Sequence, residues 1–374
     1  MAQATNHLTK LPVHPTMSVM NLNDLETPAV VVDLDRFEAN LHKLQRYLSS
    51  HHIANRPHIK THKIPQIAHM QTEAGAVGIT CQKLGEAEVM ADASITDIFL
   101  PYNIIGGKIA RLAALMKRVA ISVTADSAET VQHLKQAAQL ARRNDGKPDK
   151  PLEVLVEFDS GMHRCGVQTP EEAAALARLI HATSELTFGG LMCYPNTATL
   201  DPFVRATRAL LASDKVEIKR VSGGGTACMW HAHEHAELTE HRAGMYIYGD
   251  RATIKSGAMT QDECSFRVLA TVVSRPTAER GILDCGSKTL SSDLLGLTGH
   301  GLIVEYPDAV IYALSEEHGH TDFSKCPTKP HIGERVTIIP NHCCPVTNLF
   351  DEIMQVRGDE VVGTWKVAAR GKVT

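Results

Sequence analysis

The sequence predicts an α/β fold made of a (β/α)8 TIM-like barrel and a second, mostly antiparallel β domain. From residue 56 to about residue 249, eight short strand-like segments alternate with helical patterns, which is typical of a barrel rather than an open sheet. After residue 249 the helical periodicity stops, and short β segments joined by Gly, Pro and Asp turns replace it. The 374 residues are enough for both units, because such a barrel takes about 250 residues.

The expected elements follow in chain order. Residues 1–24 show no regular pattern and no apolar run typical of a signal peptide. Residues 28–34 are a β-branched strand, and Asp35 is the expected N-cap of the amphipathic helix after it. The barrel strands are expected at residues 57–61, 76–81, 97–102, 119–123, 154–158, 188–194, 218–222 and 242–248. The helices are expected at residues 86–93, 108–116, 128–142, 170–182 and 202–211, with a polar surface connection at 144–150.

The β domain is expected to contain seven strands, at residues 266–273, 281–283, 302–305, 310–313, 335–339, 353–356 and 361–367. We expect the N-terminal lead-in and its first strand to complete this domain. The predicted boundaries are 26–255 for the barrel, and 1–25 together with 256–374 for the β domain.

Composition narrows the range of partners. A formal net charge of −4 gives no general attraction to nucleic acid or to anionic membranes. No segment approaches the ~18 consecutive apolar residues of a membrane span. The nine cysteines are dispersed without framework spacing, which indicates reduced thiols and a cytoplasmic protein.

Residues 56–63 (RPHIKTHK) contain the first candidate functional residue. On a strand, His58, Lys60 and His62 would share one face, and three such groups suit a strand that opens into a polar pocket. Burial and nearby cations lower the pKa of a lysine, so that its amine becomes a nucleophile able to form a Schiff base. The alternative is an exposed basic edge strand that prevents self-pairing.

The loops after the last two barrel strands are candidate phosphate sites, because barrel enzymes bind phosphates there. Residues 222–226 read Ser-Gly-Gly-Gly-Thr, and glycines without Cβ let backbone N–H groups approach an anion. A flexible turn is the alternative for a lone glycine triplet. Residues 242–245 (RAGM), one strand later, favour the phosphate site. Charged residues and glycines also cluster at residues 157–167, at the end of an earlier strand.

Residues 341–345 (NHCCP) directly follow an expected strand. In extended backbone His342 and Cys344 point the same way, as two ligands of one metal would. Imidazole and thiolate suit zinc or a similar divalent ion, with open positions for water or substrate. The alternative is a buried free cysteine beside a surface histidine.

These residues carry a resemblance. The sequence resembles the fold-type III pyridoxal-phosphate enzymes of the alanine racemase barrel group, and within them the D-threonine aldolase and D-serine dehydratase branch. The matching segments span about residues 25–371 and are 56–63, 81–83 with 86–87, 159–167, 222–226, 240–248, 284–288, 316–319, 341–344, 348–351 and 365–371.

The resemblance implies that pyridoxal 5'-phosphate is the cofactor and that Lys60 binds it covalently. It implies that Arg164 lies near the phenolic oxygen, that Tyr194 lines the ring pocket and that Arg242 faces the pyridine nitrogen. A guanidinium does not give up its proton, so Arg242 would keep that nitrogen unprotonated. The remaining implied cofactor-binding residues are Gln82, Gly224, Gly225, Thr226, Gly244 and Met245.

The branch carries a metal pair of the form His-x-Asp or His-x-Cys where this chain has His342 and Cys344. The implied ion is divalent: zinc, manganese, magnesium or cobalt. The Cys form departs from typical D-threonine aldolases and agrees with the D-serine and hydroxyaspartate dehydratases.

The resemblance therefore implies a lyase that acts on β-hydroxy D-amino acids, by Cα–Cβ cleavage of the D-threonine aldolase type. The alternatives are a D-serine or 3-hydroxy-D-aspartate dehydratase, and an amino-acid racemase with Tyr306 or Tyr312 as second base. Some aldolases have a histidine where Pro195 stands, so the base for the aldol route stays open. The expected partners are a small amino-acid substrate and a second copy of the chain in a homodimer.

Several other residues are expected to lie outside the chemistry. His231, His233, His235 and His241, with Glu234, are expected to be solvated surface residues. Cys165, Cys193 and Cys285 are expected in the core or the pocket wall. His318 could reach the site or only cap a turn.

Overall fold

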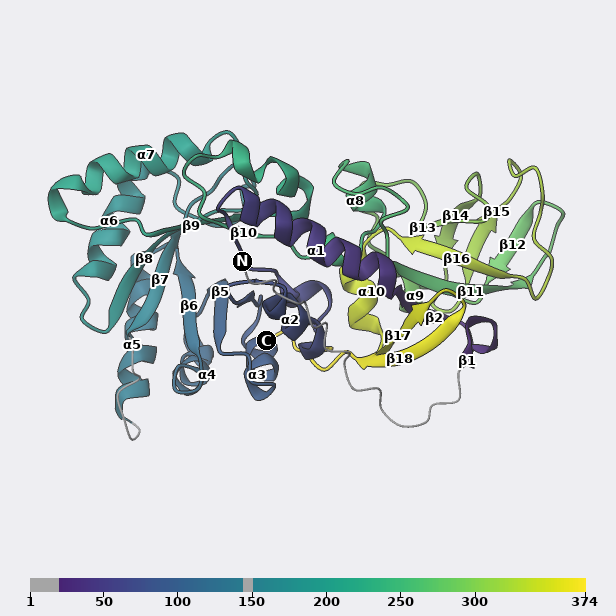
Figure 1. Ribbon diagram of the computed structural model, residues 1–374, viewed down its shortest axis with the longest axis horizontal. Helices are drawn as coiled ribbons and strands as arrows, with labels where there is room; N and C mark the ends of the chain where they lie inside the picture. The colour runs from purple at the N-terminus through teal and green to yellow at the C-terminus, as the bar shows by residue number, and fades with distance from the viewer. Residues whose placement is uncertain (1–19, 144–150) are drawn as a thin grey trace, which may run out of the picture.

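Eight parallel strands form the barrel in the computed structural model, which describes residues 20–143 and 151–374 (Figure 1). Predictions for residues 1–19 and 144–150 fall outside this range. The strand order is β3-β10-β9-β8-β7-β6-β5-β4, and a parallel bridge between His58 and Thr80 joins its two ends. The predicted (β/α)8 barrel is therefore confirmed. Its strands are β3 (Ala54–Asn55), β4 (Ile79–Thr80), β5 (Asp97–Asn103), β6 (Ala120–Ala125), β7 (Leu152–Glu157), β8 (Leu186–Met192), β9 (Arg220–Gly224) and β10 (Glu240–Arg242).

Helices lie around the outside of this barrel, whereas α8 lies beside the second domain (Figure 1). The predicted helices are present, but α2 and α8 were not predicted. Asp33, not Asp35, is the N-cap of α1, since its side chain accepts a hydrogen bond from the Arg36 backbone N–H. The helices are α1 (Leu34–Ser50), α2 (Pro65–Glu73), α3 (Leu84–Asp92), α4 (Ile109–Leu115), α5 (Ala128–Arg143), α6 (Pro170–His181), α7 (Leu200–Leu211) and α8 (Arg251–Lys255).

The second domain is a ten-stranded sheet in which only β17 and β2 pair in parallel, so the mostly antiparallel prediction is confirmed. β2, from the N-terminal part of the chain, lies between β17 and β11. Sequence reading missed β15 and two short helices, α9 (Ser287–Leu290) and α10 (Cys343–Leu349). The strands are β1 (Met20–Asn21), β2 (Ala29–Asp33), β11 (Phe266–Ser274), β12 (Arg280–Leu283), β13 (Gly301–Ile303), β14 (Val310–Leu314), β15 (Gly319–Asp322), β16 (Arg335–Pro340), β17 (Glu352–Arg357) and β18 (Glu360–Lys366).

Helix α1 joins the two domains and runs from β2 of the sheet toward the barrel (Figure 1). Its buried Phe37 lies 5.3 Å from the Trp365 ring of β18 and 6.3 Å from the Tyr248 ring at the end of the barrel. Aromatic rings packed in this way bury much apolar area, so they fix the sheet against the barrel. The C-terminal residues add a second contact, because Ala369 N donates to Lys63 O at 3.1 Å. No helix within residues 20–143 and 151–374 is long and apolar enough to cross a membrane.

Candidate active site

Lys60 lies just beyond the end of the first barrel strand. The extended segment continues past β3 to His58, whose N–H donates to Ala243 O at 2.9 Å, and a 3₁₀ turn (Ile59–Thr61) follows. The predicted strand at 57–61 was therefore placed too late in the chain, because β3 covers residues 54–55 and the extended backbone ends at His58. The turn forms because His58 Nδ1 accepts from Lys60 N at 3.4 Å and His62 N donates to Ile59 O at 3.0 Å. This places Lys60 at the carboxyl end of the strand, where barrel enzymes carry their catalytic groups.

The turn also separates the three residues that the sequence placed on one face. His62 is fully buried beside Gln71, and burial lowers its pKa to about 3. His58 contacts Gln82 Oε1 through Nε2 at 3.1 Å, so Gln82 meets the turn that carries Lys60. Neither histidine is exposed, and the alternative of an exposed basic edge strand is wrong.

The surroundings of the Lys60 amine favour its neutral, nucleophilic form. Burial lowers its pKa, Arg164 and Arg242 lower it further, and Cys344 opposes them. A lowered pKa leaves more of the amine neutral at physiological pH. Nucleophilic attack on a carbonyl requires that neutral form.

The loops after β9 and β10 meet at Thr226. Its Oγ1 accepts hydrogen bonds from Gly244 N at 3.3 Å and from Met245 N at 3.1 Å. Two N–H groups thus converge on one oxygen, an arrangement that also suits a phosphate oxygen. Gly225 has φ of +118°, and a Cβ there would lie 3.3 Å from the Tyr194 ring; a Cβ on Gly244 would lie 2.6 Å from Thr61 Oγ1. The residues therefore fit a phosphorylated cofactor that lies close to the backbone beside Lys60.

Sequence reading missed two side chains that hold this glycine loop. Asn196 Oδ1 accepts from Gly224 N at 2.7 Å, and its Nδ2 lies 3.3 Å from His241 Nδ1. His241 Nε2 lies 3.1 Å from Gly225 O, a carbonyl that accepts, so this nitrogen carries the proton. The surface prediction for His241 was wrong, because it lies within β10 and is fully buried. Burial lowers its pKa to about 4, which keeps the imidazole neutral.

Arg242 is fixed by a chain of buried hydrogen bonds. Its Nη1 donates to Ser222 Oγ at 2.6 Å, and its Nη2 donates to Cys193 O at 2.9 Å. Ser222 Oγ in turn donates to Glu240 Oε1 at 2.6 Å. The other Glu240 oxygen accepts from Arg56 Nε at 2.7 Å. Because the one Ser222 proton points at Glu240, its oxygen lone pairs face Arg242, and the guanidinium has one orientation.

We expect Ser222→Ala to lower the free energy of unfolding by about 1–3 kcal/mol, because it leaves buried donor and acceptor groups unpaired. The matched control is Ser122→Ala, which removes a hydroxyl 2.9 Å from Arg220 Nη2. Arg220 keeps its bond to Glu153 there, so the control should cost less. Chemical denaturation measures both. Equal losses in the free energy of unfolding for the two variants would show that the hydrogen bond to Ser222 does not hold Arg242.

Arg164 and Tyr194 lie together at the mouth of the barrel. The guanidinium carbon of Arg164 stands 5.1 Å from the centre of the Tyr194 ring, and Nη2 is 3.9 Å from Glu157 Oε1. Burial raises the pKa of Glu157 to about 7, although Arg164 and Arg242 act in the opposite direction. Cys165, next to Arg164, is exposed rather than part of the core, whereas Cys193 and Cys285 are buried as predicted.

His342 and Cys344 lie beside the Lys60 turn, but a helix places them there and not the predicted extended segment. Helix α10 begins at Cys343 with His342 as N-cap, so the extended backbone that was expected is wrong. The Cys344 thiol lies 3.4 Å from Thr61 Oγ1, and His342 Nδ1 lies 2.7 Å from Asp293 Oδ2. Burial lowers the pKa of His342, but hydrogen bonds with Cys344 and Asp293 outweigh it and raise the pKa to about 9.

This donor pair fits a divalent metal chemically. A thiolate and an imidazole are ligands that zinc and similar ions accept, and a catalytic site keeps open positions. In the parts of the chain that the structure describes, no group of three or more His, Cys, Asp or Glu side chains is arranged to hold a metal ion. An ion bound here would therefore draw its remaining ligands from water or substrate. Asp293 was missed by sequence reading, since no motif surrounds it.

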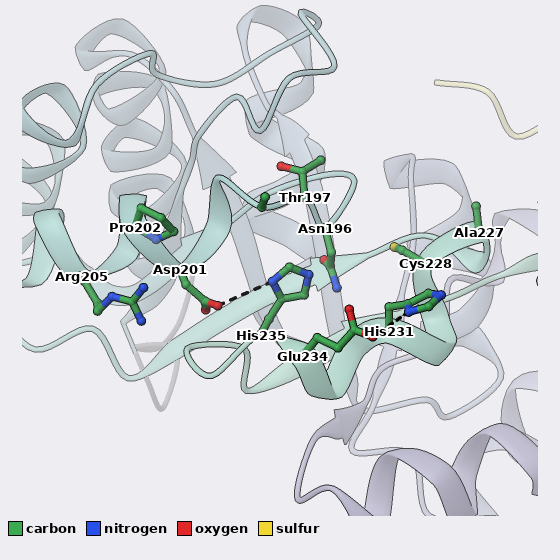
Figure 2. Close-up of a pocket in the computed structure, with 11 residues that line it drawn as sticks. Asn196, Thr197, Asp201, Pro202, Arg205, Ala227, Cys228, His231, Glu234 and His235 are labelled. Carbon is green, nitrogen blue, oxygen red and sulfur yellow. Dashed lines mark hydrogen bonds and ion pairs between the residues drawn. The ribbon is translucent and has the colours of Figure 1, made fainter.

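A cavity of about 550 Å³ borders the outer side of the glycine loop, between α7 and residues 226–235 (Figure 2). His235 points at Asp201 across this cavity at 3.7 Å, and His231 pairs with Glu234 at 2.8 Å (Figure 2). His231 and His233 are exposed as predicted, whereas His235 is half-buried in this wall. His318 is exposed in the turn between β14 and β15.

Two family models match consecutive parts of the chain. The alanine racemase N-terminal domain matches residues 32–252, and the serine dehydratase domain matches residues 265–356. Among curated proteins, the D-threonine aldolase of an Arthrobacter species is 33% identical over 93% of each chain. The 3-hydroxy-D-aspartate aldolase of Paracoccus denitrificans is 29% identical and covers 96% of this chain and 95% of that protein.

Solved structures show the same overall likeness. The D-threonine aldolase from Filomicrobium marinum has a TM-score of 0.85 at 30% identity and covers 96% of this chain and 99% of that one. The D-threo-3-hydroxyaspartate dehydratase from Delftia sp. HT23 has a TM-score of 0.80 at 26% identity, covering 92% of this chain and 98% of that one. A cysteine-to-alanine mutant of a D-threo-3-hydroxyaspartate dehydratase was solved in a metal-free form.

Proposed function

This chain belongs to the family built from an alanine racemase N-terminal domain followed by a serine dehydratase domain, and we propose that it is a pyridoxal-phosphate-dependent lyase of the D-threonine aldolase type. Its substrates would be β-hydroxy D-amino acids, which it would cleave between Cα and Cβ to glycine and an aldehyde. The full-length likeness to D-threonine aldolases supports this choice.

The observation that carries the proposal is the meeting of the two domains at one turn. Lys60 and Thr61 come from the barrel, and Cys344 reaches Thr61 from the β domain at 3.4 Å. A nucleophilic amine and a pair of soft metal donors thus lie beside one another. This is what an enzyme needs if it is to hold an amino acid by its nitrogen and act on its β-hydroxyl.

The cofactor would be held by Lys60 and by the loops around Thr226 and Gly244, and when bound it would stabilise negative charge at the substrate Cα. Lys60 Nζ would attach the cofactor covalently, and as a free amine it would take or return the proton at the substrate Cα. Arg242 holds a fixed positive charge at the far end of the site, oriented by Ser222 and Cys193 O. Tyr194 and Arg164 pack against each other at the barrel mouth and would flank the cofactor.

We propose His342 and Cys344 as the ligands of a divalent metal, which would supply a Lewis acid for the substrate β-hydroxyl. In the aldol route a base would take the hydroxyl proton, the Cα–Cβ bond would break with release of an aldehyde, and Lys60 would protonate Cα to give glycine. In β-elimination Lys60 takes the α-proton and the hydroxyl leaves as water. Hydrolysis then gives a 2-oxo acid and ammonia.

The second candidate is therefore a D-serine or 3-hydroxy-D-aspartate dehydratase. Cys344 favours it, because the thiolate form of the metal pair is the one found in those relatives, and Pro195 stands where some aldolases have a histidine. A racemase has less support. Tyr306, one of its two candidate bases, donates its hydroxyl to Glu334 within the β domain.

Product analysis separates these candidates. The holoenzyme, supplied with a divalent metal, is incubated with D-threonine and with D-serine. We expect equal amounts of glycine and acetaldehyde from D-threonine. A yield of 2-oxobutanoate and ammonia would replace the aldolase with a dehydratase. L-allothreonine from D-threonine, or L-serine from D-serine, would identify a racemase.

We also propose that the enzyme is a cytoplasmic homodimer. Apolar side chains stand exposed at the barrel mouth, with Met162 51% and Ile105 50% accessible, and a second chain could cover them. All nine cysteines are free, as in a reducing compartment.

A further inference from the structure

His342 is held on one side of its ring, where Nδ1 lies 2.7 Å from Asp293 Oδ2. Asp293 belongs to the loop between α9 and β13, far in sequence from the metal pair that it contacts. It is not part of the pair itself, because its carboxylate meets the histidine and not the thiol.

The Asp293 carboxylate is itself anchored. Its Oδ1 accepts from Leu295 N at 3.3 Å, while Oδ2 is left for His342. The backbone N–H of Asp293 donates to Ser291 Oγ at 3.2 Å. Each carboxylate oxygen of Asp293 therefore has its own partner, and Oδ2 is a fixed acceptor for the His342 imidazole.

A fixed acceptor decides which ring nitrogen of His342 carries the proton. An ionised carboxylate only accepts hydrogen bonds, so its partner Nδ1 must be protonated. In a neutral imidazole the other nitrogen, Nε2, then has a free lone pair. A metal ligand needs that lone pair aimed at the ion, and carboxylate partners of this kind orient metal-binding histidines generally.

We propose that Asp293 is the positioning residue of the metal pair: it fixes the tautomer and orientation of His342 and so sets the affinity for the divalent ion. The inference rests on the proposed function, because it assumes that His342 and Cys344 bind a metal. Asp293 contacts neither substrate nor cofactor in this role. Its removal should weaken metal binding and spare the rest of the site.

The test is isothermal titration calorimetry of Mn²⁺ or Zn²⁺ into chelator-treated holoenzyme. We expect Asp293→Ala to raise Kd by about 10–100-fold, the usual scale for such partners. Asp293→Asn keeps an acceptor oxygen but loses the charge and should fall between Ala and wild type. Asp293→Glu should restore part of the affinity. The matched control, Asp322→Asn, removes a carboxylate that also accepts a backbone hydrogen bond, from Ser324 N, and should leave Kd unchanged.

The outcomes separate this inference from the proposed function. If the wild type binds metal and Asp293→Ala binds it equally well, Asp293 has no positioning role, although the metal pair stands. If the wild type binds no metal, both are overturned. At saturating metal the Asp293→Ala enzyme should regain most of its kcat. A kcat that stays low at saturation would overturn the positioning role in favour of a direct one.

Discussion

Lys60→Ala should abolish lyase activity. No other lysine lies in the turn at the end of the first barrel strand, so nothing would replace the amine that we propose binds the cofactor and moves the proton at Cα. Loss of a nucleophile of this kind costs ~10⁴-fold or more in kcat. Steady-state assays with D-threonine would measure it, with circular dichroism to show that the barrel is intact.

The matched control is Lys83→Ala. Lys83 follows β4 at the same end of the barrel, and its Nζ lies 3.2 Å from Tyr102 OH. This residue takes no part in the proposed chemistry, so we expect kcat to stay within about tenfold of wild type, a modest change on the scale of catalytic losses. Substantial turnover by Lys60→Ala would rule out the proposed role of Lys60.

Cys344→Ala has the second largest expected effect. It removes a ligand of the proposed metal, so the loss of metal affinity should exceed the ~10–100-fold typical of residues that only support a ligand. Turnover should fall with it, while the absorbance of the bound cofactor should stay, because in the proposed site Lys60 and the Thr226 loop would hold the cofactor independently of the metal. Cys344→Asp should restore part of the activity and shift preference from zinc toward manganese, since carboxylate oxygen suits the harder ion.

Cys343 is not a suitable control, although it is the neighbour of Cys344. It is fully buried at the start of α10, and its N–H donates to Asp250 Oδ2 at 3.0 Å. Cys285, buried elsewhere in the β domain, is the better match for a Cys→Ala change. Full activity after chelator treatment, or equal losses in Cys285→Ala and Cys344→Ala, would contradict the metal role.

The two-domain fold could be predicted from the sequence because local patterns of hydrophobic residues determine it. Strand segments in the barrel alternate with amphipathic helices, and the change of rhythm after residue 249 marks the sheet domain. Local pattern did not fix the end of the first strand. The turn that carries Lys60 depends on the His58 side chain, which accepts from the Lys60 N–H.

The contacts that shape the site were hidden because they join distant parts of the chain. His241 looked like one of a run of polar loop histidines, yet it lies inside β10 and holds Gly225 O. Asp293 stands 49 positions before His342 in the sequence, and no periodicity links the two. Helix α10 was not predicted because the segment 341–345 is short and polar. The helix is stabilised by its packing against the Lys60 turn, a contact between distant parts of the chain.

The most direct test of the central proposal is to find where the cofactor is attached. The holoenzyme is reduced with borohydride, digested and mapped by mass spectrometry. We expect the pyridoxyl group on Lys60 alone. A label on Lys63 or Lys83, or no covalent label at all, would contradict the proposed site.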